Sequence, residues 1–154
     1  MKVAVSGPVD PKRPRGASSA AQLVKDTLSF LAAGHDELYS GSAHGIDSYA
    51  VLAARDYNAR VTLVVPEGNW YNREAEGDAT IVVPARSSSA ATYMARNFKL
   101  AELADVLYAF PQTENEEQRS GTWATIRRFQ AFGKSVWITP LDGSEPHCLV
   151  RRTV

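Results

Sequence analysis

The chain has 154 residues, of which 44% are hydrophobic and 22% are charged. This size and composition fit one globular domain over residues 1–154 and leave no room for two. Its 17 basic and 17 acidic residues give zero formal charge, so no global charge draws it to nucleic acid or a membrane surface. A lone cysteine, Cys148, excludes an intrachain disulfide and any multi-cysteine zinc site. With no long apolar run and no leader segment, we expect a cytoplasmic protein.

Apolar strands and amphipathic helices alternate along the chain. The periodicity predicts short strands at residues 2–6, 37–39, 61–65, 81–83, 106–110 and 136–138. Helices are predicted at residues 19–34, after the turn at 40–47, at 89–104, and after residue 120 up to 133. Met94, Phe98 and Ala101 give the third helix one apolar face. The alternation predicts an α/β fold: one Rossmann-like domain, a mostly parallel sheet with helices on both faces.

Two glycine turns stand where a predicted strand passes into a helix. Residues 40–47 read SGSAHGID and residues 120–123 read SGTW. At this junction of an open α/β sheet, free backbone N–H groups and the positive end of the helix dipole favour phosphate. Glycines also serve simply to turn the backbone, and Ser40 and Ser120 also suit helix caps. Two such turns at matching positions nevertheless predict one cleft lined from both sides.

The motifs in both halves resemble known families. Residues 39–47 resemble the SGxARGID turn of the DNA-processing DprA/Smf family, and GNWYN at 68–72, followed by Arg96-Asn97, keeps the order of its later motifs. MARN at 94–97, ADV at 104–106, Pro111 and Gly121-Thr122 resemble the MxxRK, ADA and PGGxGTxxE series of the LOG (Lonely Guy) phosphoribohydrolases. Over most of its length the chain therefore resembles the SLOG superfamily of Rossmann-like nucleotide-binding folds. That resemblance implies a homodimer.

The chain departs from both families at residues that matter for chemistry. In the LOG pattern a glutamate follows the GT turn and supports cleavage of the N-glycosidic bond, whereas residues 123–126 here read WATI. Loss of acid–base participation costs on the order of 10² to 10⁴-fold in rate. Glu114, Glu116 and Glu117 in the acidic loop are alternative carboxylates. His44 stands where the DprA turn has a basic residue.

The expected ligand-binding residues come from the two turns and the helix between them. They are Ser40, Gly41, Ser42, His44, Gly45, Asp47, Arg96, Asn97, Ser120, Gly121 and Thr122. Arg96 matches the LOG arginine, is expected to neutralise ligand charge, and is the best catalytic candidate if the protein is an enzyme. Asp47 either complements its helix dipole or orients a ribose hydroxyl. His44 acts either as an acid or base or as a hydrogen-bond donor.

Several other residues have both a functional and a structural interpretation. Trp70, Tyr71 and Trp123 suit either a base-stacking surface or the core. The basic cluster at residues 12–15, KRPR, either holds phosphates at the cleft mouth or is solvated. His35 and His147 lack ligand spacing, so no metal and no cofactor is expected.

The sequence predicts a sensor or sequestering protein that binds a nucleotide or nucleotide-derived phosphate ligand across the two turns. Two alternatives stay open. One is a LOG-like phosphoribohydrolase that cleaves the base–ribose bond of a nucleoside monophosphate. The other is DprA-like binding of single-stranded DNA. The expected partners are therefore a nucleotide-derived small molecule, single-stranded DNA in the second alternative, and a second copy of the chain, but no membrane.

Overall fold

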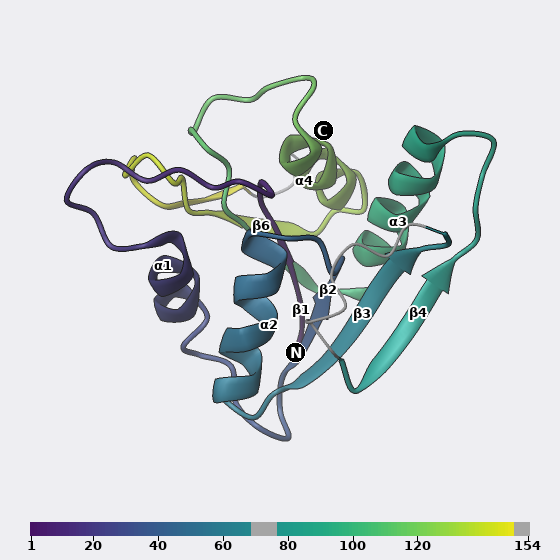
Figure 1. Ribbon diagram of the computed structural model, residues 1–154, viewed down its shortest axis with the longest axis horizontal. Coiled ribbons are helices and arrows are strands. Elements are labelled where there is room, and N and C mark those ends of the chain that lie inside the picture. Colours follow the sequence, from purple (N-terminus) through teal and green to yellow (C-terminus); the bar gives the residue numbers. More distant parts are fainter. Residues whose placement is uncertain (69–76, 150–154) are drawn as a thin grey trace.

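The computed structural model describes residues 1–68 and 77–149. This part of the chain forms four helices and a seven-stranded sheet (Figure 1). The strands are β1 (Lys2–Ser6), β2 (Glu37–Ser40), β3 (Arg60–Pro66), β4 (Ala79–Val83), β5 (Val106–Ala109), β6 (Ser135–Ile138) and β7 (His147–Leu149). The helices are α1 (Ala20–Thr27), α2 (Ile46–Asp56), α3 (Ser89–Leu103) and α4 (Gly121–Ala131).

The sheet is mostly parallel, with strand order β4-β3-β2-β1-β5-β6-β7. Every pairing from β4 to β6 is parallel, and only β7 runs antiparallel to its neighbour. Strands buried on both faces read as continuous apolar runs, which is why β1 and β3 were predictable. The predicted α/β, Rossmann-like fold is confirmed. Strand β7 was not predicted, because three residues are too few to show a strand pattern, and they form a strand by pairing with residues 136–138 of β6.

Two hydrophobic cores lie on opposite faces of the sheet. Val24 of α1 and Ile46 of α2 belong to the first core, together with Val3 of β1. Leu100 of α3 and Phe129 of α4 belong to the second core. Helices therefore cover both faces, as predicted. Within the described ranges, none of the helices combines the length and hydropathy needed to cross a membrane.

Helix α1 is shorter than the sequence indicated. It begins after the predicted cap, where the Ser19 hydroxyl accepts the Gln22 N–H at 3.1 Å, but it ends at Thr27 instead of reaching Gly34. Leu28 and Leu31 are still buried, because successive turns carry the chain along the same core. Helical spacing of apolar residues was therefore an unreliable guide to the end of this helix.

The predicted apolar face of α3 is wrong in part. Met94 and Phe98 are 56% and 43% exposed, and only Ala101 of the three is buried. The buried side of α3 instead carries Thr92 and Asn97 beside its apolar residues. Phe98 packs against Phe132 of the chain after α4, with ring centroids 5.1 Å apart. Asn97 lines the site described below, whereas the Thr92 hydroxyl hydrogen-bonds to the backbone of Arg86 and Ser88.

The strand order reverses at the centre of the sheet. From β1 the chain winds outward through β2 and β3 to β4, and α3 then returns it to β5 on the other side of β1. The connections that leave β1 and β5 consequently diverge. In open α/β sheets this divergence opens a crevice at the carboxyl ends of the strands.

Candidate functional site

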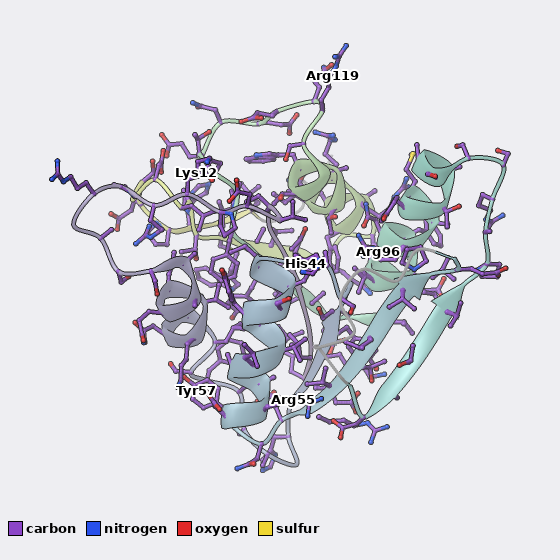
Figure 2. All side chains as sticks on the ribbon, in the orientation of Figure 1. Lys12, His44, Arg55, Tyr57, Arg96 and Arg119 are labelled. Carbon is purple, nitrogen blue, oxygen red and sulfur yellow. The ribbon has the colours of Figure 1, made fainter. Side chains whose placement is uncertain are left out.

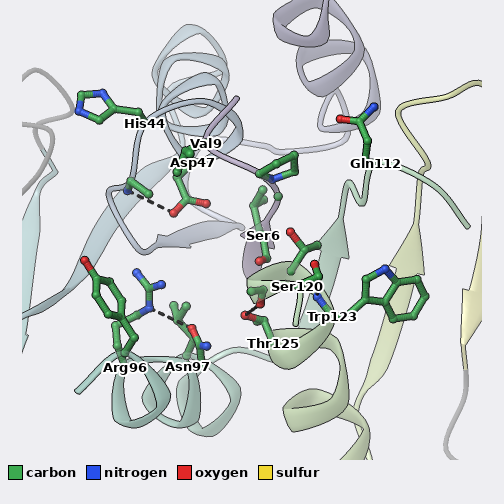
Figure 3. Close-up of a pocket in the computed structure, with 18 of the residues that line it drawn as sticks. Ser6, Val9, His44, Asp47, Arg96, Asn97, Gln112, Ser120, Trp123 and Thr125 are labelled. Atoms are coloured by element: carbon green, nitrogen blue, oxygen red, sulfur yellow. Dashed lines mark hydrogen bonds between the residues drawn. The ribbon is translucent and has the colours of Figure 1, made fainter. Parts of the chain in front are cut away.

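A cavity of about 770 Å³ opens at the carboxyl ends of β1 and β5, where the strand order reverses (Figure 3). The walls come from four segments of the chain. They are residues 5–9 at the end of β1 and just after it, residues 43, 44 and 47 around the start of α2, residues 93, 96, 97 and 100 of α3, and residues 112, 117, 120–123 and 125 around the start of α4. A cavity of this size lies within the range that holds a small-molecule ligand or cofactor.

The structure brings most of the predicted ligand-binding residues to this cavity. Those that line it are His44, Asp47, Arg96, Asn97, Ser120, Gly121 and Thr122. Ser40, Gly41, Ser42 and Gly45 do not line it. The two glycine turns therefore face one cavity, but the first turn contributes through fewer residues than the sequence indicated.

Ser40 and Gly45 hold the first turn in shape. The fully buried Ser40 hydroxyl accepts the Ser42 N–H at 3.2 Å and donates to the Asp47 carbonyl at 3.4 Å. Gly45 precedes α2 with φ of 75°, in the left-handed region that favours glycine. A Cβ at Gly45 would stand 2.5 Å from the Val9 carbonyl oxygen, so this glycine also lets the turn contact the loop after β1.

Gly41 makes room for the Arg96 guanidinium. A Cβ at Gly41 would stand 2.0 Å from Arg96 Nη1 and 3.0 Å from Asp47 Oδ2. Arg96 Nη1 donates to the Gly41 carbonyl at 3.0 Å, which joins α3 to the first glycine turn. The requirement for glycine here therefore comes from a side chain 55 positions away along the chain.

Arg96 is held in place on three sides. Its Nε donates to Asn97 Oδ1 at 3.1 Å, its Nη1 donates to Gly41, and its guanidinium carbon lies 5.7 Å from the centroid of the Tyr93 ring. Within residues 1–68 and 77–149, its Nη2 group has no hydrogen-bond partner. A planar cation with fixed orientation and free N–H groups is suited to phosphate or carboxylate.

The first turn of α4 offers backbone donors to the same cavity. The Ser120 hydroxyl caps this helix by accepting the Trp123 N–H at 3.3 Å. Gly121 and Thr122 are the first two residues of α4. Their backbone N–H groups have no hydrogen-bond acceptor in the described part of the chain. Such groups carry the partial positive charge of a helix N-terminus. Around Gly121 a Cβ would meet nothing within 4 Å, so the approach to these N–H groups is open.

Asp47 places a carboxylate opposite Arg96. Figure 3 shows the two side chains directed toward each other across the cavity, and Asp47 Oδ2 accepts the Ala43 N–H at 3.2 Å. The side chain is 6% exposed, and this burial raises the pKa of Asp47 from 3.8 to about 6, against the opposing effects of Arg96 and the Ala43 N–H. A carboxyl group with this pKa changes charge close to neutral pH.

Gln112 and Glu117 are among the lining residues that the predicted set left out. The Gln112 side chain accepts the Lys12 N–H at 3.0 Å and donates to the Lys12 carbonyl at 2.6 Å, which ties the loop after β1 to the loop after β5. Glu117 lines the cavity, whereas Glu114 and Glu116 do not. Arg127 of α4 holds this loop by donating to the Glu117 carbonyl at 3.4 Å. Spacing alone did not distinguish the three glutamates.

The remaining candidates lie elsewhere or have structural partners. Trp123 lines the cavity but is almost fully buried in the second core. Trp70 and Tyr71 fall outside the described residues. In the basic cluster at residues 12–15, the Arg13 guanidinium donates to the carbonyls of Ser18 and Leu141. That cluster does not line the cavity.

Comparison with known proteins supports the fold assignment. No protein-family model matches the sequence, and no curated protein matches it. Similar solved structures include two DNA processing proteins A (DprA). The one from Helicobacter pylori has a TM-score of 0.69 at 19% identity, over 94% of this chain and 69% of that one. The one from Streptococcus pneumoniae has a TM-score of 0.64 at 22% identity, over 89% of this chain and 49% of that one.

A third similar structure is the molybdenum cofactor carrier protein of Chlamydomonas reinhardtii, with a TM-score of 0.57 at 18% identity over 89% of this chain and 74% of that one. All three structures are at most 22% identical to this chain, and their likeness to it confirms the Rossmann-like fold that the family resemblance implied.

We expect Gly41→Ala to displace the Arg96 guanidinium, because the added methyl group would overlap Nη1. The change should lower the free energy of unfolding by about 1–3 kcal/mol, the usual cost of overpacking a tight site. Gly121→Ala is the matched control, since its Cβ would meet nothing within 4 Å. Urea denaturation checks both variants, and equal stability of the two would contradict this role of Gly41.

We expect the stability of the protein to depend on the ionisation of Asp47. Its pKa is about 6 in the folded state against an ordinary 3.8, so the folded state binds this proton more tightly than the unfolded state. The stabilisation by the protonated form is complete below pH ~4 and is lost as the pH rises through 6. Relative to the wild type, Asp47→Asn should gain roughly 2–2.5 kcal/mol of unfolding free energy between pH 4 and pH 7.5, because part of the effect is already lost at pH 4. Urea denaturation at both values measures this difference, and a constant difference would contradict it.

Proposed function

We propose that the cavity binds a nucleotide or nucleotide-derived phosphate ligand, and that the protein is a sensor or sequestering protein for it. One observation carries this proposal: the free N–H groups of Gly121 and Thr122 and the fixed guanidinium of Arg96 face one cavity at the reversal of strand order. In open α/β sheets this is the place and the donor chemistry that bind phosphate.

The other walls suit the remaining parts of such a ligand. Pro8 and Val9 after β1, together with Leu100 of α3, offer apolar surface to a base or sugar. Asp47 and Glu117 offer carboxylate oxygens, the acceptors that ribose hydroxyls need. The cavity of about 770 Å³ lies in the size range of nucleotide and cofactor sites.

Hydrolysis of the ligand is the second candidate function. The carboxylate that the LOG pattern places on the helix is absent, but Glu117 faces the same cavity from the preceding loop. If the protein is an enzyme, we propose that it cleaves the N-glycosidic bond of a nucleoside monophosphate, with Arg96 holding the phosphate.

Binding of single-stranded DNA is the third candidate. The similar structure from H. pylori is described by its single-stranded DNA binding mode, which supports this candidate for the present chain. Zero formal charge and the Glu117 carboxylate in the cavity wall weigh against it, because single-strand binding uses a continuous positive groove.

We further propose that the chain acts in the cytoplasm as a single-domain homo-oligomer. The family resemblance supports the homo-oligomer, and so does an exposed apolar cluster formed by Met94, Phe98 and Phe132. Met94 and Phe98 are one helical turn apart on α3, and the Phe98 ring contacts that of Phe132. A second copy of the chain would cover this cluster.

Nucleotide binding should depend on Arg96 and on the open space at Gly121. We expect Arg96→Ala to weaken binding about 10- to 100-fold, the effect of losing charge-assisted hydrogen bonds. We expect Gly121→Val to obstruct the N–H groups of α4. Matched controls are Gly121→Ala and Arg55→Ala, because Arg55 lies at the opposite end of α2 from His44 (Figure 2).

Thermal shift measures ligand binding by each variant. The ligands are nucleoside mono-, di- and triphosphates, ADP-ribose, cyclic oligonucleotides and short single-stranded DNA. A ligand at about 100 times its Kd adds roughly 2.7 kcal/mol, which moves the midpoint by several degrees. Release of free base during incubation would favour the hydrolase. A shift produced by DNA alone, with affinity falling steeply as salt rises, would favour the third candidate. No shift with any ligand would refute all three.

The homo-oligomer should depend on the apolar cluster. We expect Phe98→Glu to dissociate it, since a charge buried in an apolar interface costs several kcal/mol. Leu52→Glu is the matched control, because Leu52 is an exposed apolar residue on α2, outside the cluster. Sedimentation velocity measures the mass of each variant. A monomeric wild-type protein at high concentration would contradict the proposal.

A further inference from the structure

Two opposite charges face each other in the cavity without forming a close ion pair. The Asp47 carboxylate and the Arg96 guanidinium flank the space that a Gly41 Cβ would fill, 3.0 Å and 2.0 Å from its position. The Asp47 carboxylate and the Arg96 guanidinium do not form one of the salt bridges in the described part of the chain, all of which have N–O distances of 4.0 Å or less. In the described part of the chain the Asp47 carboxylate receives one hydrogen bond, from Ala43. Arg96 therefore serves as a nearby counter-charge for a carboxylate that is poorly solvated.

An anionic ligand at Arg96 would change this balance. Asp47 is 6% exposed, so a new negative charge at the guanidinium would act on it through a medium of low dielectric. Two anions that share such a site cannot both stay ionised without a large cost, and one of them takes up a proton. Sulfate and phosphodiester groups are fully ionised near neutral pH and are far weaker bases than a carboxylate, so with such a ligand the proton goes to Asp47. A phosphate monoester has a second pKa near 6 and competes for the same proton.

We propose that Asp47 is a specificity-determining residue of the anion site, whose carboxylate takes up one proton from solvent when an anion binds at Arg96. The site then holds the anion and the proton together. This inference rests on the proposed function, because it requires an anionic ligand at Arg96. The uptake couples affinity to pH: binding of a ligand of constant charge weakens as the pH rises above about 6, by up to about tenfold per pH unit.

The effects of the other titratable groups around the cavity must be distinguished from the effect of Asp47. In the described part of the chain these are His44 before α2, Tyr93 and Arg96 on α3, and Glu117 before α4, whereas residues 5–9 after β1 contain none. Tyrosine and arginine ordinarily titrate far above neutral pH. A protonated His44 would also favour an anion at low pH, so its contribution requires its own variant.

Sulfate is the probe for the test, because it stays dianionic across the pH range and cannot itself supply the pH dependence. Isothermal titration calorimetry at constant ionic strength, in buffers of different ionisation enthalpy, gives both Kd and the number of protons taken up. The wild type should take up close to one proton per sulfate at pH 7 and lose affinity from pH 6 to pH 8. Arg96→Ala should abolish binding.

Two variants distinguish the sources of the proton. Asp47→Asn should bind sulfate with little pH dependence, without proton uptake, and more tightly than the wild type at pH 8. His44→Gln should keep both the pH dependence and the uptake. Sulfate binding by the wild type without proton uptake would overturn the inference and leave the proposed function standing, and this measurement requires no variant to fold. Absence of both sulfate and nucleotide binding would overturn the two together.

Discussion

The site depends on the position of β1 in the sheet. Hydrogen bonds to β2 on one side and β5 on the other bury this strand on both edges, and the two hydrophobic cores bury it on both faces. Because the chain leaves β1 and β5 in opposite directions, a crevice opens at the carboxyl ends of these two strands. The opening that provides a cavity is therefore a consequence of parallel pairing and of the order in which the strands are used.

The contact between Arg96 and Gly41 connects the two halves of the chain across this opening. It fixes a cation from α3 against the turn before α2, while the capped start of α4 supplies backbone donors from another wall. Asp47 is buried beside that cation, so the charge of the site is balanced internally before any ligand arrives.

The fold could be predicted to a large extent because its central strands are continuous apolar runs and its helices are marked by caps such as Ser19 and Ser120. Errors occurred where tertiary contacts override local pattern. Leu31 is buried without being helical, and Met94 and Phe98 lie outward although their spacing fits an apolar face. Strand β7 exists only through its pairing with β6, which no local signal records.

The sequence by itself determined the α/β alternation, the two glycine turns and the residue types that face one cavity, because these depend on local periodicity and on backbone conformations that only certain residues adopt. Tertiary structure alone decided what each of these residues does. Gly41 accommodates a guanidinium instead of a phosphate, Ser40 holds its own turn, and Glu117 rather than Glu114 or Glu116 reaches the cavity. The physical reason is that these roles arise from contacts between segments far apart in the chain, and spacing along a sequence contains no information about such distances.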